Sequence, residues 1–226
     1  RIGNAYAVAN HYKRDVVFFT NNEKKAIQAA YQQAETPDQI IKLTTALVQS
    51  FGMESDKAFA QFSKEDSFFA HIGGLVMQTG GAGDNVKLAV EGFLLMQGEE
   101  NKKIYSVKNE DRASVVDEYS SAFLMNRDTQ NSTIEAANYI YAAQLKNAGK
   151  SGFDSFDKFA YEKAFKMAAG ATYVAGVMGS TNFDNFYGGF DEHNDNKVYI
   201  PGWLQEGKFD DVVKTLKDHP ELIDMG

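Results

Sequence analysis

Apolar residues recur every three or four positions along most of this chain, the spacing that gathers them on one face of an α-helix. The clearest case begins at Thr36-Pro37-Asp38-Gln39, which combines a capping residue with a proline at the first helical position. The helix predicted there carries a continuous apolar stripe, formed by Ile40, Ile41, Thr44, Leu47, Val48 and Phe51. Because such stripes are buried against one another, the pattern predicts a mainly α-helical fold.

Capping motifs mark two more helix starts. Thr20-Asn21-Asn22-Glu23 is a full capping box and predicts a helix over 24–35. Ser63, with Asp66 three residues later, is a variant of that box and precedes a strongly apolar run. The pair Gly73-Gly74 inside this run weakens the helix by about 1–2 kcal/mol, which predicts that another backbone approaches it closely within a packed core.

A cluster of glycines ends this apolar helix. Gly80, Gly81 and Gly83 adopt positive φ readily, and Asp84 is expected to cap the next helix, over 85–97. Because the connecting turn is short, the two helices should pack nearly antiparallel as a helical hairpin.

The same criteria assign the rest of the chain. Further helices are predicted from Ser55 through Phe62, over about 109–125, from Asn131 or Ser132 to about Asn147, from Asp154 or Ser155 to about Ala171, and over 208–216. The helix that ends near Asn147, with Gly149 as its stop, is apolar on more than one face and is predicted to be central. The helix after it should turn Phe156, Phe159, Ala160 and Met167 inward. Residues 1–14 are interpreted as a lead-in, 15–19 as extended and 99–108 as a charged connector.

These predictions describe one domain over 1–226. It has a lead-in at 1–19, a helical body at 20–180, a β-hairpin at 181–204 and a closing helix at 205–226. The expected fold class is mainly α, a multi-helix bundle of antiparallel helical hairpins with one small C-terminal β-hairpin. The hairpin is predicted from aromatic residues on both sides of a polar tip at Asp191–Asn196, and Trp203 should pack it onto the body.

Composition narrows the possible functions. The net charge of −8 argues against a nucleic-acid backbone as the main partner. The absence of cysteine excludes disulfides, thiolate metal sites and thiol nucleophiles. No apolar run approaches the length of about 18 residues that a transmembrane helix needs. Because the first residue is Arg1 rather than methionine, we expect a domain cut from a longer protein or a processed product.

The sharpest enzymatic hypothesis rests on Glu54. The runs that suggest it are Glu54-Ser55, Leu75-Val76-Met77-Gln78 and Ala136-Ala137-Asn138-Tyr139. In this order they resemble motifs of the goose-lysozyme-like lytic transglycosylases, in which the glutamate protonates the glycosidic oxygen and needs an apolar pocket that raises its pKa. Val76 interrupts the second run, Asn138-Tyr139 inverts the third, and Glu54 falls in a predicted exposed connector. We therefore favour a surface residue near a helix start.

No metal or cofactor site is predicted. Several acidic and amide side chains crowd one loop, namely Asp184, Asp191, Glu192, Asn194 and Asp195. Their spacing differs from the helix-loop-helix calcium pattern and favours a solvated hairpin tip, although cation binding at Asp191–Asn196 stays open. The histidines at 11, 71, 193 and 219 include no i, i+4 pair of the kind that binds zinc, and His71 is expected to be a satisfied core or boundary residue. The sequence thus gives no catalytic, cofactor-binding or metal-ligating residue and no cofactor.

Three stretches suggest a family. The first runs from Phe18-Phe19-Thr20-Asn21-Asn22-Glu23 to Ala29-Ala30-Tyr31, the second from Phe59-Ala60-Gln61-Phe62 through Ala70-His71-Ile72-Gly73-Gly74-Leu75, and the third comprises Lys197-Val198-Tyr199-Ile200-Pro201 and the helix at 209–216. In order and spacing they resemble a helical region of large tailed-phage and prophage virion proteins, often encoded with a transglycosylase domain. The resemblance implies an internal or ejection protein, carried in the particle and released at infection. It supplies no catalytic residue, because hydrolase activity in those proteins lies in another domain, which this chain lacks.

The predicted function is a non-catalytic structural or interaction domain of a phage virion protein, either internal, ejected or tail-associated. Its expected partners are other virion proteins or copies of itself, without nucleic acid as the main partner and without a transmembrane segment. Its expected location is the phage particle, with delivery into the host envelope or periplasm. Two alternatives stay open: a peptidoglycan hydrolase that uses Glu54, and a bacterial envelope or effector module that binds proteins.

Overall fold

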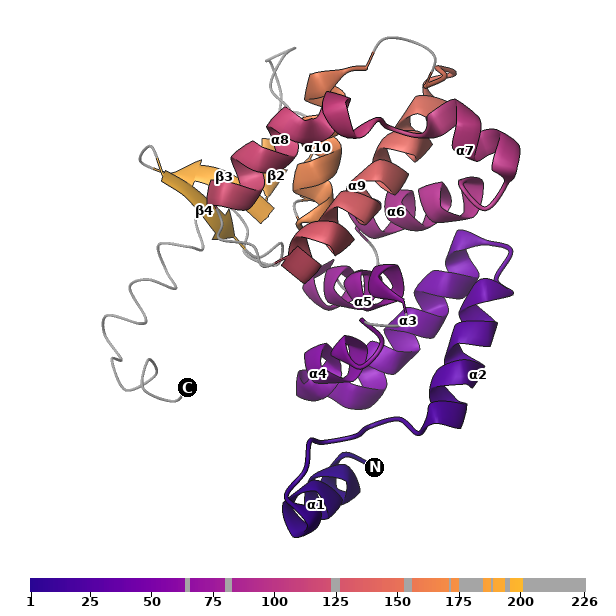
Figure 1. The fold of residues 1–226 in the computed structure, drawn as a ribbon, viewed down its shortest axis with the longest axis vertical. Coiled ribbons are helices and arrows are strands. Elements are labelled where there is room, and N and C mark those ends of the chain that lie inside the picture. The colour runs from indigo at the N-terminus through magenta and orange to yellow at the C-terminus, as the bar shows by residue number, and fades with distance from the viewer. Residues whose placement is uncertain are drawn as a thin grey trace.

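The computed structural model describes residues 1–63, 66–79, 83–122, 127–152 and 156–170, and beyond these only short strands between 172 and 200. In this part of the chain the fold is mainly α-helical, as the periodicity predicts (Figure 1). The helices are α1 (Ile2–Tyr12), α2 (Asn21–Gln32), α3 (Pro37–Phe51), the 3₁₀ turn η1 (Gly52–Glu54), α4 (Ser55–Ala60), α5 (Ser67–Thr79), α6 (Asp84–Leu95), α7 (Glu99–Tyr105), α8 (Asn109–Ala122), α9 (Arg127–Asn147) and α10 (Lys158–Ala168).

Short antiparallel strand pairs follow α10. β1 (Thr172–Val174) pairs with β2 (Asn185–Tyr187), and β3 (Gly189–His193) pairs with β4 (Asn196–Ile200). The other residues of the predicted hairpin at 181–204, and all of the predicted helix at 205–226, lie outside the described residues. The hairpin and the closing helix therefore stay predictions.

The core is organised around α9, which contacts α5, α6 and α10. Its buried side chains lie on several sides of the helix and are Ala136, Ala137, Ile140, Tyr141, Ala142, Ala143 and Leu145. The prediction of a central helix is therefore confirmed. Gly149 follows its end with a φ of +66°, in the left-handed region that favours glycine. The helix begins earlier than predicted, at Arg127.

The backbones of α6 and α9 approach each other closely at Gly92. A Cβ at this position would lie 1.8 Å from the carbonyl oxygen of Tyr139. Any side chain at position 92 would therefore collide with the backbone of α9. Close by, the rings of Phe68 and Phe93 pack against the Tyr139 ring, with centroid separations of 4.7 and 5.7 Å.

A second aromatic cluster joins α3 and α4 to α5. Its rings contact one another in a chain, and they belong to Phe18, Phe19, Phe51, Phe59, Phe62 and Phe69. Gly73 of α5 permits this packing, since a Cβ there would lie 2.3 Å from the Phe59 ring. The packed core predicted at the glycine pair is present at Gly73, but the predicted backbone neighbour is wrong there, because the close neighbour is the Phe59 side chain. At Gly74 the predicted close approach is wrong, because a Cβ would meet nothing within 4 Å.

The predicted starts of α2 and α3 are confirmed. Thr20 and Glu23 form the complete capping box of α2, and Pro37 is the first residue of α3. The pKa of Glu23 is lowered to about 2, first by its hydrogen bond from the Thr20 backbone and then by the Arg1 side chain. Local sequence rules therefore suffice at these two helix starts.

The capping residues of α5 and α6 differ from those predicted. The α5 cap is Asp66 rather than Ser63, because the Asp66 carboxylate accepts from the Phe69 N–H at 2.9 Å. Asp84 is the first residue of α6 rather than its cap, which is Gly83. Helices α5 and α6 contact each other, but α5 packs more extensively on α3 and α4, and α6 on α9.

Two segments predicted to be irregular are helical. Residues 1–14 contain α1, because its apolar face packs against the core through Ile2, Ala5, Tyr6 and Ala9. The connector at 99–108 contains α7, whose acidic first turn and basic last turn complement the helix dipole. Packing against the core thus stabilises α1, whereas charges at its own two ends stabilise α7.

The start of α10 also differs from the prediction. Asp157 caps the helix, since its carboxylate accepts from the Ala160 N–H at 3.0 Å. Phe156 packs against the core as expected, but Phe159, predicted to point inward, is 77% exposed. Tyr161, Ala164 and Phe165 occupy the buried face instead.

We expect Gly92→Ala to lower the free energy of unfolding by about 1–3 kcal/mol or more, because the added methyl group would push α6 away from the α9 backbone. Gly74→Ala is the matched control. It should raise the free energy of unfolding by about 0.5–1 kcal/mol, since alanine favours a helix and its methyl group meets open space. Urea unfolding followed by circular dichroism measures both; similar effects would contradict the close contact at Gly92.

Candidate functional site

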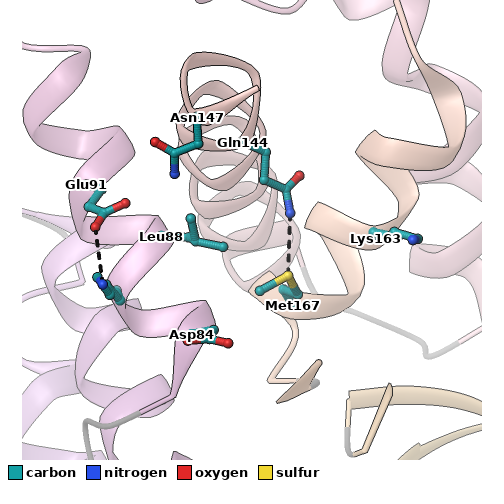
Figure 2. Close-up of a pocket in the computed structure, with 8 residues that line it drawn as sticks. Asp84, Leu88, Glu91, Gln144, Asn147, Lys163 and Met167 are labelled. Carbon is teal, nitrogen blue, oxygen red and sulfur yellow. Dashed lines mark hydrogen bonds and ion pairs between the residues drawn. The ribbon is translucent and has the colours of Figure 1, made fainter. Parts of the chain in front are cut away.

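A pocket of about 420 Å³ lies where α6, α9 and α10 meet (Figure 2). Each helix contributes residues three or four positions apart, which helical geometry places on one face. The lining residues are Asp84, Lys87, Leu88 and Glu91 of α6, Gln144 and Asn147 of α9, and Lys163 and Met167 of α10. The volume falls in the range of sites for small molecules.

Two side chains from other helices hold the last turn of α10 beside this pocket. Asn85 donates from Nδ2 to the Met167 carbonyl at 3.3 Å. His71 donates from Nε2 to the Ala168 carbonyl at 2.7 Å, so that Nε2 carries the proton. Because the last carbonyls of a helix lack intrahelical donors, these side chains cap α10 and fix its position. The prediction of His71 as a satisfied boundary residue is confirmed.

The pocket combines an apolar floor with charges of both signs. Figure 2 shows Leu88 and Met167 between the polar side chains of the three helices. Lys87 Nζ lies 3.9 Å from the Glu91 carboxylate on the same helix. The Gln144 amide donates to the Met167 thioether, a weak acceptor, at 3.7 Å. Such a lining suits a small polar molecule with an oxygen atom. That oxygen would accept a hydrogen bond from Gln144 better than the Met167 thioether does.

Glu54 lies on η1 and is not among the residues that line the pocket. Its carboxylate accepts from the Tyr6 hydroxyl at 2.7 Å and pairs with Lys57 Nζ at 3.1 Å. These contacts lower the pKa of Glu54, the Tyr6 hydrogen bond most strongly. A general acid that works near neutral pH needs a raised pKa. The other two runs of the enzymatic hypothesis lie on α5 and α9, whereas these partners of Glu54 lie on α1 and α4.

Acidic side chains meet between the start of α5 and α9. Ser67 Oγ and the Tyr139 hydroxyl donate to the Glu135 carboxylate at 2.9 and 3.2 Å. Burial raises the pKa of neighbouring Asp66, and the charge of Glu135 adds to the effect. The buried hydroxyl of Tyr31 has no hydrogen-bond partner among the described residues. The sequence identifies Asp66 only as part of a capping motif. Its proximity to Glu135 could not be predicted, because the two residues are far apart in the chain.

The described residues include five exposed large apolar side chains, of which only Phe159 lies outside the first 53 positions. Four of them form what we call the N-terminal surface: Val8 and Tyr12 of α1, Val17 after it, and Met53 of η1. Tyr6 joins these segments, since its ring lies 6.1 Å from that of Phe18 and its hydroxyl bonds to Glu54. Met53 is 98% exposed and Tyr12 66%. Clustered exposed apolar groups are typical of protein-binding surfaces.

The described residues form neither a metal-binding cluster nor a membrane-spanning helix. No three His, Cys, Asp or Glu side chains gather closely enough there to hold a metal ion. None of the described helices combines the length and apolarity needed to cross a lipid bilayer. Of the acidic and amide residues that crowd the predicted hairpin tip, Asp191 and Glu192 belong to β3, whereas Asp184, Asn194 and Asp195 lie outside the described residues. Cation binding at Asp191–Asn196 stays a prediction.

Tyr6→Phe should raise the pKa of Glu54 toward its ordinary value, because the hydroxyl is the main group that stabilises the carboxylate. The measurement is an NMR pH titration of the Glu54 side-chain carboxyl carbon. Tyr12→Phe, on the exposed side of the same helix, is the control and should leave this pKa unchanged. An unchanged Glu54 pKa in Tyr6→Phe would show that the hydrogen bond is absent in solution.

His71 should make folding stability depend on pH. Burial lowers its pKa below the usual 6.5, so the unfolded chain takes up a proton first as the pH falls. Stability is therefore complete above about pH 6.5 and decreases as the pH falls below it. His71→Gln keeps an N–H donor but does not titrate, so its melting temperature should fall less between pH 7.5 and 5.5. His11→Gln, on an exposed position, should behave like the wild type; equal slopes in all three would contradict the assignment.

Comparison with known proteins assigns no function to these sites. No protein-family model, no curated protein and no solved structure matches this chain.

Proposed function

We propose that this chain is a non-catalytic structural or interaction domain of a tailed-phage virion protein, an internal, ejection or tail-associated component carried in the particle. Its partners in this proposal are other virion proteins or further copies of the chain. The chain forms one domain whose helices pair as antiparallel hairpins, closed by the β-hairpin at 181–204 and the helix at 205–226. The phage setting rests on the three stretches that resemble virion proteins.

The observation that carries the interaction role is the N-terminal surface. A helix that only closes the core would turn its large apolar side chains inward, whereas α1 leaves Val8 and Tyr12 exposed, and Val17 and Met53 are exposed as well. Exposing these four groups to water is unfavourable, and covering them with a partner would recover about 25 cal/mol per Å² of buried apolar area. This surface therefore supports binding to a protein.

The environment of Glu54 is the reason that we do not propose the hydrolase. Its carboxylate is held ionised by Tyr6 and Lys57, whereas protonation of a glycosidic oxygen requires an acid that keeps its proton near neutral pH.

The proposal predicts association with a virion component. Purified chain should form oligomers in size-exclusion chromatography with light scattering, or should capture a structural protein from disrupted phage particles in a pulldown. Replacing Tyr12 and Met53 by serine should weaken that association, because it removes the two most exposed members of the N-terminal surface. Phe159→Ser, an equally apolar exposed position on α10, is the matched control. A chain that stays monomeric and captures no particle protein would contradict the proposal.

A further inference from the structure

Helix α1 lies at one end of the molecule. Figure 1 shows it at the lower tip of the long axis, while α8 lies near the opposite end. One side of α1 faces the body, through Tyr6 and Ala9. Val8 and Tyr12, four residues apart, share a different side that faces solvent.

The end of α1 is also basic. Residues 1–14 include Arg1, Lys13 and Arg14 but no aspartate or glutamate, although the whole chain has a net charge of −8. Arg1 is engaged within the molecule by Glu23. Lys13 and Arg14 are exposed, next to Asp15, and the Arg14 guanidinium lies 5.4 Å from the centre of the Tyr12 ring. Cationic groups thus adjoin the exposed aromatic ring.

Helix α8 has the complementary character. Val115, Val116 and Tyr119 are buried, and the helix packs on α10. Its exposed face carries four acids: Glu110, Asp111, Asp117 and Glu118. Lys108 lies 3.9 Å from Glu110, a solvent-exposed pair that contributes little. The outer side of α8 is therefore predominantly acidic.

We propose that the basic, apolar end of α1 in one copy of this chain docks on the acidic face of α8 in the next copy. This inference rests on the proposed interaction function and names its partner. Lys13 and Arg14 would face Asp111 and Asp117, which sets the orientation and speeds association. Tyr12, with Val8 and Val17, would supply the buried apolar area at the centre of the contact.

The position of the two surfaces determines the kind of assembly. They are different surfaces at opposite ends of the molecule, and the contact that we propose between them is head-to-tail. A head-to-tail contact produces a closed ring where the rotation closes and a filament where it does not. The exposed acids of α8 provide on the chain itself a surface of opposite charge to Lys13 and Arg14, which is why the proposed occupant is a second copy.

Charge reversal tests the contact. Sedimentation velocity of the whole chain, over a range of concentrations at 50 and 500 mM salt, should show association that weakens as salt is added. K13E/R14E should weaken it by about tenfold or more, and so should D111K/D117K. Mixing the two variants should restore assembly, because each then offers the surface that the other one needs. K146E/K150E reverses two exposed lysines at the end of α9 and is the matched control, with association unchanged.

Three results would overturn the inference. They are a monomer at every concentration, association that none of the reversals changes, and a failure of the mixed variants to assemble although each keeps the wild-type circular dichroism spectrum and melting temperature. Binding to vesicles of anionic lipid that depends on Lys13 and Arg14, without self-association, would assign α1 to a membrane surface instead. A monomer that still captures another particle protein would refute this contact and leave the proposed function standing.

Discussion

The close approach of α6 to α9 at Gly92 is the contact on which the described fold depends. Because the Tyr139 carbonyl oxygen occupies the space of a side chain at position 92, the two helices can lie at this distance only with glycine there. The same approach brings Phe93 against the Tyr139 ring and places the α6 and α9 residues of the pocket around a common space. The packing of the core and the geometry of the pocket therefore both require glycine at position 92.

Polar side chains inside the fold mostly join elements that are distant in sequence. Asn85 and His71 bond to the last turn of α10, and the Gln61 amide bonds to the backbone of Val16 and Phe18 at 3.0 and 3.1 Å. An unpaired buried polar group costs about 1–3 kcal/mol, so each of these bonds favours one arrangement of its elements over others. Asp66 differs, because burial raises the pKa of its carboxyl group.

The features that bear on function lie mainly on the surface and at the ends of the molecule. Helix α1 falls within residues 1–14, for which the sequence predicts only a lead-in. In the structure the Tyr6 side chain attaches it to Phe18 and Glu54, which leaves Tyr12 exposed beside Arg14. The proposed contact with α8 follows from this placement and from the separation of basic and acidic residues along the molecule.

The sequence by itself determined the helical class, the capping box at Thr20, the proline start of α3 and the central place of α9, because these follow from local hydrogen bonding and from the period of apolar residues. The composition, which contains no cysteine, excludes cysteine chemistry, and the local rules explain the glycine stop at Gly149. Tertiary structure alone decided which face of α10 is buried, that Gly92 rather than Gly74 is indispensable, that Asp66 meets Glu135, and which residues line the pocket. Each of these depends on atoms from distant segments meeting in space, and no spacing along the chain records such a meeting.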